Sequence, residues 1–196
     1  LKARGIYTVA RIVTFKDTVL AQAKPEWAII DTRTGKPWID NEKLAWVDPF
    51  REEVRDYNIA IAKEAIAKGF DEIQFDYVRF PSDGDIARAV YPGKTSVPRG
   101  RVIAGFVAYA KKRLEAKGVR VSTALFGLSA TRDLGIGQVP RYISRYADSI
   151  SPMSYPVLYG GGDGALSPPV YSAVGANPRA VAAGDFNGDT WLDAAT

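Results

Sequence analysis

The stretch GFDEIQFDYVRFP, residues 69–81, places an acid, a phenol and a guanidinium at the end of an otherwise apolar strand. The sequence contains no His and no Cys, so any proton transfer falls to Asp, Glu, Tyr or Lys. Asp76, with Tyr77 and Arg79 beside it, is therefore a candidate nucleophile or general base. The alternative is a structural ion pair in which Arg79, or Arg11 on the preceding strand, neutralises Asp76.

The composition excludes several other kinds of chemistry. Without Cys and His, the sequence predicts no disulfide, no thiolate or imidazole metal site and no Ser-His-Asp triad. The net charge of +4 comes from scattered basic residues, which indicates a solvated surface and no nucleic-acid partner. The longest apolar runs are too short for a membrane span, and no signal peptide is visible. Because the chain opens at Leu1 and its only methionine is Met153, we expect a piece of a longer protein.

The residues around Asp76 predict alternating strands and helices. Residues 5–15 and 72–80 are rich in β-branched and aromatic residues, as strands are. Between them, Asp48 as N-cap and Pro49 in the first turn predict a helix that ends at Gly69. Residues 24–40 read as an excursion with a small hairpin, and further helices are predicted at 99–117 and 138–146, each followed by a strand.

Both long helices end in Ala-Lys-Gly followed directly by a strand, which is typical of successive β-α units in a parallel sheet. Four strands and three crossover helices fit within about 155 residues, whereas a complete (β/α)₈ barrel takes roughly 250. The predicted fold class is therefore α/β, either an open sheet or part of a TIM-type barrel. In such folds the carboxyl ends of the strands carry the chemistry, and Asp76 lies at that end of its strand, where it would form part of the active-site floor.

Four segments resemble the family of putative glycosyl hydrolase domains, which is distantly similar to α-amylase-like and endo-galactosaminidase barrels: WVDPFREEVRDYNIAIAKEAIAKGFDEIQFDYVRFPSDGD, RIVTFKD, FGLSATRDLGIGQ and DSISPMSYP. The resemblance covers about residues 4–156 and implies a (β/α)₈ barrel with Asp76 at the fourth-strand position of the nucleophile or base. The first barrel strands and the continuation after MSYP depart from the family pattern. We therefore expect a partial barrel over residues 1–156, with open sheet edges available for pairing with another chain.

Glycoside hydrolysis needs a second carboxyl group, and two candidates follow predicted strands. Asp133 in TRDLGIGQ ranks ahead of Asp17 in FKD, although either could instead be a loop or helix-cap residue, and the partner could also lie outside this chain. Aromatic rings stack on sugars and arginines donate to hydroxyl groups, whereas core packing is the alternative for the rings. The candidate substrate contacts are Arg11, Trp46, Tyr77, Arg79, Gln138 and Tyr155.

The composition changes after Pro156 to a segment rich in Gly, Pro, Ala and Asp, which sets a predicted domain boundary between residues 1–156 and 157–196. In DFNGDTWLD, oxygen ligands alternate as they do in calcium loops, but Thr190 stands where an EF-hand has Gly. Residues 157–196 instead resemble one FG-GAP (VCBS-type) repeat, the blade unit of integrin-like β-propellers. The resemblance implies a structural Ca²⁺ site with Asp185, Asn187, Asp189, Asp193 and the Trp191 carbonyl as ligands. The alternative is an Asx-rich turn without metal.

Together these features predict a glycoside hydrolase of the extracellular space or cell surface that cleaves a polysaccharide or oligosaccharide with Asp76 as nucleophile or base. The first alternative is a non-catalytic carbohydrate-binding or adhesion fragment. The second is a truncated, inactive hybrid. A second carboxylate within reach of Asp76 distinguishes the enzyme from the binding fragment.

Overall fold

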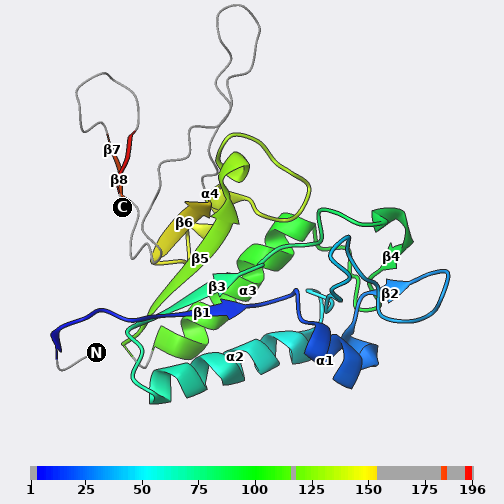
Figure 1. Cartoon of the computed structure of the whole chain (residues 1–196), viewed down its shortest axis with the longest axis horizontal. Coiled ribbons are helices and arrows are strands. Elements are labelled where there is room, and N and C mark those ends of the chain that lie inside the picture. Colours follow the sequence, from blue (N-terminus) through cyan, green and yellow to red (C-terminus); the bar gives the residue numbers. More distant parts are fainter. Residues whose placement is uncertain (1–3, 116–117, 154–181, 185–192, 196) are drawn as a thin grey trace, which may run out of the picture. The chain divides into compact units, whose positions relative to one another are not determined.

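A computed structural model describes residues 4–115, 118–153, 182–184 and 193–195 (Figure 1). By its internal contacts the chain divides into two units, Leu1–Ser154 and Tyr155–Thr196. The first contains a four-stranded parallel sheet whose order follows the chain, β1-β3-β5-β6. Its strands are β1 (Val9–Val13), β3 (Glu72–Asp76), β5 (Arg120–Phe126) and β6 (Ser149–Met153).

Two long helices cover one face of this sheet, as Figure 1 shows. Helix α2 (Glu52–Ala67) lies between β1 and β3 in the chain, and α3 (Arg99–Leu114) lies between β3 and β5. The short helix α4 (Pro140–Ile143) precedes β6. Strands that follow one another in the chain and pair in parallel through helices are the unit of a TIM-type barrel, which confirms the predicted α/β class.

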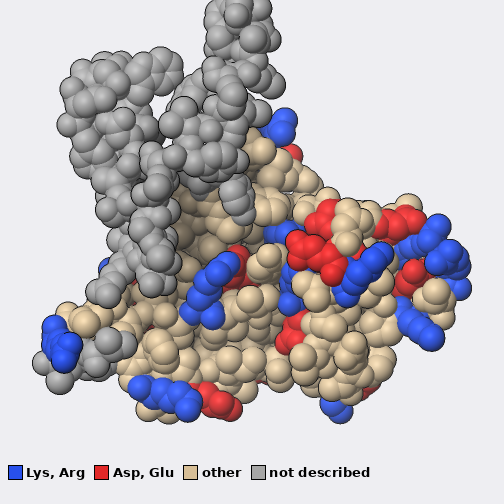
Figure 2. Space-filling model, viewed as in Figure 1, with Lys and Arg blue, Asp and Glu red and all other residues tan. Residues whose placement is uncertain are grey.

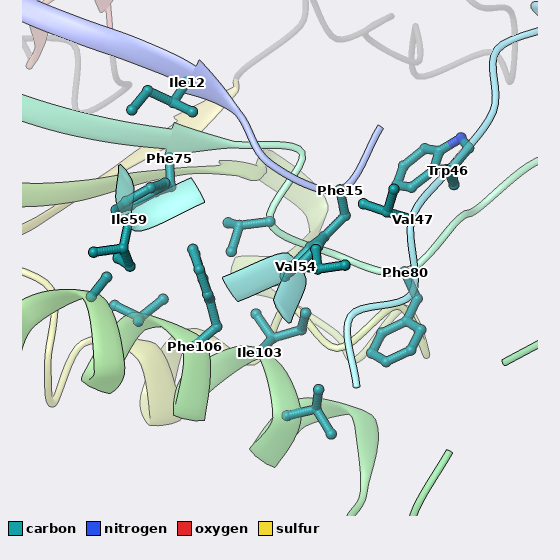
Figure 3. Close-up of a cluster of buried hydrophobic side chains, with 14 of the residues drawn as sticks. Ile12, Phe15, Trp46, Val47, Val54, Ile59, Phe75, Phe80, Ile103 and Phe106 are labelled. Atoms are coloured by element: carbon teal, nitrogen blue, oxygen red, sulfur yellow. The ribbon is translucent and has the colours of Figure 1, made fainter. Parts of the chain in front are cut away.

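The core fills the space between the sheet and the two helices (Figure 3). Phe106 of α3 lies edge-on against Phe15 and Phe75, with ring centroids 5.3 and 5.0 Å apart. Ile12 of β1 and Ile59 of α2 close the same cluster. Each fully buried phenylalanine contributes about 1.5–3 kcal/mol relative to an exposed one, so this layer fixes the sheet on its helices.

The opposite face of the sheet, which would line the interior of a closed barrel, carries both polar and apolar side chains. Arg11 and Gln74 alternate with the core residues of their strands, and the amide of Gln74 donates to the hydroxyl of Ser151 across β5, at 3.1 Å. Val9 and Val13 on this side are each 43% exposed. The sheet thus presents hydrogen-bonding groups on the face that carries Asp76.

The segment between β1 and α2 forms an excursion beyond the carboxyl end of β1 (Figure 1). It contains α1 (Thr18–Ala23) and β2 (Ile30–Asp31), which pairs antiparallel with β4 (Ala89–Val90). A bridge between Ile30 and Pro37 closes the predicted hairpin. The excursion brings residues 40–48 next to the end of β3.

Several predicted boundaries are wrong, including both ends of the first strand, which spans Val9–Val13 and not residues 5–15. Strand β3 ends at Asp76 because Tyr77 has a left-handed backbone, with φ of 49°, which breaks the expected alternation. Helix α2 begins at Glu52, because the Asp48 carboxylate accepts from the amides of Phe50 and Gly93 instead of capping a helix. The third helix shortens from 138–146 to the four residues of α4.

The second unit contains the two-stranded antiparallel pair β7 (Ala182–Gly184) and β8 (Asp193–Ala195). Within the described ranges of the whole chain, no helix is long and apolar enough to cross a membrane. On the face of the molecule in Figure 2, basic and acidic side chains are interspersed, without a broad patch of one sign.

Candidate active site

Asp76 is the last residue of β3, and its side chain lies on the same face of the sheet as Gln74. The residue is 1% exposed, and its carboxylate forms an ion pair with Arg11 of the neighbouring strand β1. The other carboxylate oxygen accepts the backbone N–H of Tyr77 at 2.6 Å. The predicted pairing with Arg11 is confirmed, and it supplies the opposite charge that a buried carboxylate requires.

Arg11 covers Asp76 with a side chain that is 59% exposed. The carboxylate is therefore buried beneath a long polar side chain, which can move more easily than packed core residues. Asp76 itself is almost inaccessible in this structure.

Tyr77 begins the loop after β3 in a left-handed conformation that is costly for residues other than Gly, Asn and Asp. Its ring lies edge-on to Trp46, with centroids 6.0 Å apart. Lys16 Nζ lies 5.1 Å and Arg79 Cζ 5.3 Å from its centroid. These contacts on several sides hold Tyr77 in a backbone state that its own preferences disfavour.

Lys16 links the end of β1 to the excursion through two carboxylates. Its Nζ lies 2.9 Å from Asp40 and 2.7 Å from Glu42, and its side chain is 6% exposed. Burial by itself lowers the pKa of Lys16, but the hydrogen bonds to Glu42 and Asp40 outweigh burial, so the pKa is raised. Lys16 is therefore a buried cation held between acids.

Asp40 connects Lys16 to Trp46 through its carboxylate. Its carboxylate also accepts the indole N–H of Trp46 at 3.0 Å and the backbone N–H of Leu44 at 3.0 Å. Burial raises the pKa of Asp40, but the hydrogen bonds from Trp46 and Lys16 outweigh burial and bring the pKa below its usual value. Asp40 and Glu42 belong to no recognisable sequence motif, and Lys16, in FKD, was not among the predicted site residues.

A hollow of about 470 Å³ opens next to this cluster, and we call it the rim hollow. It is lined by Val13, Lys16, Asp17, Glu42, Leu44 and Tyr77, among others. Asp17 also caps α1, since its carboxylate accepts the N–H of Leu20 at 2.8 Å. The rim hollow thus combines an aromatic ring and two carboxylates at the carboxyl end of β1 and β3, beside the residue that follows Asp76.

Arg79 is a buried cation behind Tyr77. It is 4% exposed, and its guanidinium lies 4.5 Å from the ring of Phe126 and 5.0 Å from that of Trp46. It donates to the carbonyl of Phe80 at 3.1 Å, and burial lowers its pKa. No ion pair among the described residues includes Arg79, so aromatic rings and the local backbone hold it in place.

The remaining predicted contacts have structural partners. Trp46 is fully buried, so in this structure its ring supports Tyr77 and is not available for stacking on a sugar. Gln138 is 1% exposed, and its side-chain oxygen accepts the N–H of Phe126 at the end of β5. Asp133 is exposed, and its carboxylate accepts the N–H of Gly135 in its own loop. None of these three lines the rim hollow.

The predicted calcium loop cannot be placed from the structure. Tyr155 and four of the five proposed ligands lie outside the described residues, and of Asp193 only the backbone, in β8, is described. Calcium binding stays a prediction. Titration calorimetry with Ca²⁺ checks it: we expect one site in the unmodified chain and weaker binding after Asp185→Asn, and binding that is unchanged by the substitution would contradict it.

The family model described as "putative glycosyl hydrolase domain" matches residues 1–182. The chain belongs to this family. The match continues past the boundary predicted at residue 156, and these comparisons give no support to the predicted FG-GAP-type repeat. No curated protein matches the chain.

Several solved structures share the fold. A hypothetical protein from Ruminiclostridium thermocellum ATCC 27405 is 40% identical, with a TM-score of 0.54, over 62% of this chain and 60% of that chain. Ega3 from Aspergillus fumigatus, in complex with galactosamine, is 14% identical, with a TM-score of 0.53, over 77% and 52%. A variant of the glycoside hydrolase domain of PelA from Pseudomonas aeruginosa is 15% identical, with a TM-score of 0.51, over 85% and 58%. The chain thus spans between 52% and 60% of these structures.

Proposed function

We propose that this domain hydrolyses O-glycosidic bonds in a polysaccharide or oligosaccharide, with Asp76 as nucleophile or general base. Membership of the glycosyl hydrolase family supports the reaction class. The observation that carries the proposal is the position of Asp76 at the carboxyl end of β3 in a parallel sheet, where barrel enzymes keep their reacting groups.

In this proposal Arg11 holds the Asp76 carboxylate ready and gives way when a sugar enters. The carboxylate then either attacks the anomeric carbon or takes a proton from the attacking water. Released from Asp76, the guanidinium is free to donate to sugar hydroxyl groups. The ring of Tyr77, which lines the rim hollow, offers an apolar face to a pyranose ring.

The acid that protonates the leaving group comes from a second carboxyl group. Asp17 and Glu42 both line the rim hollow beside Tyr77, and this favours them over Asp133. Glu42 has a side chain that is 67% exposed and can turn away from Lys16 into solvent, where it takes up the proton that a general acid must carry, whereas Asp17 is engaged in capping α1. We therefore propose Glu42 as the first choice and Asp17 as the second.

The test is turnover of a polysaccharide panel by the unmodified chain, Asp76→Asn, Glu42→Gln and Asp17→Asn. Loss of an acid or base typically costs about 10²–10⁴-fold in rate, which is the loss expected for Asp76→Asn. Asp85→Asn serves as the matched control, because Asp85 is an exposed aspartate paired only with Arg88. Equal turnover by Asp76→Asn and Asp85→Asn would contradict the assignment of Asp76.

The 1% exposure of Asp76 favours a second candidate function, a carbohydrate-binding module without catalysis. A binding module would retain saccharides while neither the unmodified chain nor any variant released reducing ends. Saccharide binding together with absent turnover across the panel would therefore replace the hydrolase by this alternative.

A further inference from the structure

A second hollow, of about 420 Å³, lies beside the start of α3, and we call it the basic hollow. Its wall comes from Phe50 before α2 and from the connection between β4 and α3, including Tyr91, Lys94, Val97 and Arg99. It shares no lining residue with the rim hollow. Because this connection leads from the carboxyl end of β3 into α3, the basic hollow belongs to the loops that follow the strands.

The charged residues that line the basic hollow are both cations. Lys94 and Arg99 contribute to its wall, and no carboxylate does. The Arg99 guanidinium lies 4.8 Å from the ring of Phe80 and 5.4 Å from that of Tyr91, and it donates to the carbonyl of Gly135. Among the ion pairs of the described residues, none includes Lys94 or Arg99. Both charges remain available to an anion.

Helix α3 starts at the same place without a neutralising group. Its N-cap is Pro98, which offers no side-chain hydrogen bond, and its first turn contains no acidic residue. The free N–H groups and the dipole of a 16-residue helix favour a negative charge at this end.

An independent observation comes from Tyr91, which lines the basic hollow and is 8% exposed. Its hydroxyl group is buried and has no hydrogen-bond partner in the described part of the chain. Burial raises the pKa of Tyr91, against the positive charge of Arg99, so the hydroxyl group keeps its proton and can donate it to an acceptor. Buried donors without partners are rare in folded proteins, and a ligand in the basic hollow, which the Tyr91 side chain lines, is one source of the missing acceptor.

Two further unpartnered donors belong to residues that do not line the hollow. Of the five buried side-chain atoms without partners in the described residues, two more belong to Arg51 and Arg55, close to the same loop. A side chain added at Gly93 would meet Arg51 and the carboxylate of Asp48, which shows how tightly this loop packs on the start of α2. Asp48 is fully buried, its carboxylate accepts two backbone N–H groups, and it does not line the hollow.

The basic hollow also offers apolar surface. Phe50 lies edge-on to Tyr91, with centroids 6.1 Å apart, and Val97 is 45% exposed. Apolar surface beside cationic donors suits a sugar ring that carries an anionic group.

We propose that the basic hollow is a saccharide subsite that binds a sugar bearing a carboxylate or sulfate group, with Lys94, Arg99 and the Tyr91 hydroxyl as its donors. The choice of a sugar rests on the proposed glycosidase function, whereas the anionic group follows from the charges and donors described above. The subsite selects acidic polysaccharides and holds them at the same end of the sheet as Asp76.

Equilibrium binding to the full chain tests this subsite, with trigalacturonate as the carboxylate probe, a sulfated carrageenan oligosaccharide as the sulfate probe and maltotriose as the neutral probe. We expect saturable binding of at least one acidic probe, at least tenfold tighter than maltotriose and weakened by salt. Tyr91→Phe is expected to weaken binding about tenfold without lowering the melting temperature, because the hydroxyl group has no partner in the free protein. Lys94→Gln combined with Arg99→Gln is expected to abolish the preference for acidic probes.

Arg101→Gln provides the matched control, because Arg101 carries the same charge in the same helical turn but lies over the ring of Tyr142. The proposal is overturned if neither acidic probe binds more tightly than maltotriose. It is also overturned if Arg101→Gln weakens binding as much as the Lys94/Arg99 double variant, or if Tyr91→Phe binds like the unmodified chain. Asp76→Asn is expected to bind the acidic probe normally, so a failed hydrolase proposal leaves this result intact.

Discussion

Strand β3 carries one buried carboxylate near each end on the same face, and the two are held in different ways. Glu72, 8% exposed, accepts hydrogen bonds from the neutral hydroxyl groups of Tyr7 and Ser122. Asp76, 1% exposed, is paired with the cationic Arg11 and with a backbone N–H. Two hydroxyl donors from neighbouring segments fix the Glu72 carboxylate in place. The single cation that pairs with Asp76 is exposed and can move away from it. The comparison agrees with a structural role for Glu72 at the amino end and with the role proposed for Asp76 at the carboxyl end.

The strongest test of these two different roles is to replace each carboxylate by an amide in turn. Asp76→Asn is expected to lower turnover by about 10²–10⁴-fold while changing stability little, because the amide still accepts the N–H of Tyr77. Glu72→Gln is expected to keep turnover but to cost about 1–3 kcal/mol of unfolding free energy, because an amide cannot accept from both hydroxyl groups. Kinetics and chemical denaturation of both variants check this, and the reverse pattern would refute the division of roles.

Removing the cation from the carboxyl end is expected to have the next largest effect. Arg11→Ala leaves Asp76 buried with one backbone partner, at a cost of about 2–3 kcal/mol, below the full value for a buried pair because Arg11 is 59% exposed. Urea denaturation measures the difference. Arg33→Ala, an exposed arginine in a turn, is the control and should change stability by less than about 0.5 kcal/mol.

The loss of folding stability at low pH is expected to involve Asp40, in the cluster next to the carboxyl end of β3. The pKa of Asp40 is lowered in the folded protein, so its contribution is complete above the unfolded value of about 3.9 and is lost as the pH falls through the folded value. Asp40→Asn is therefore expected to cost about 2 kcal/mol at pH 7 and less at pH 3. Unfolding at a series of pH values checks this, and a cost that does not depend on pH would count against it.

The smallest expected effect is a loss of folding stability at high pH, which involves Tyr7 at the amino end of β3. Burial and the hydrogen bond to Glu72 raise the pKa of Tyr7 to about 12. The contribution of Tyr7 is complete below its unfolded pKa of about 10 and is lost as the pH rises towards 12. Tyr7→Phe should flatten the loss of stability in this window. A pH profile that matches the unmodified chain would show that the Tyr7–Glu72 contact is not maintained in solution.

The sequence predicted the sheet well because each β-α unit is encoded locally. Helix stripes, the Ala-Lys-Gly endings and apolar strands all lie within short windows, and the ion pair between Arg11 and Asp76 follows from adjacent parallel strands. The predicted N-cap at Asp48 failed because a distant residue, Gly93, uses its carboxylate.

The rim hollow could not be predicted either, because its residues come together from distant parts of the sequence. Lys16 meets Asp40 and Glu42 from more than twenty positions away, through an excursion with no strong periodicity. Tyr77 is a predicted substrate contact, but its left-handed backbone depends on contacts with Trp46, Lys16 and Arg79, which no local pattern encodes.

The half-exposed guanidinium above Asp76 makes the site responsive to its medium. Salt screens an ion pair that is exposed to solvent far more than an ion pair that is buried in the core. At high ionic strength Arg11 would spend more time away from the carboxylate beneath it, which opens the way to that acid while leaving it uncompensated. Solutions of high and low ionic strength would then set different balances between access to Asp76 and its pairing with Arg11.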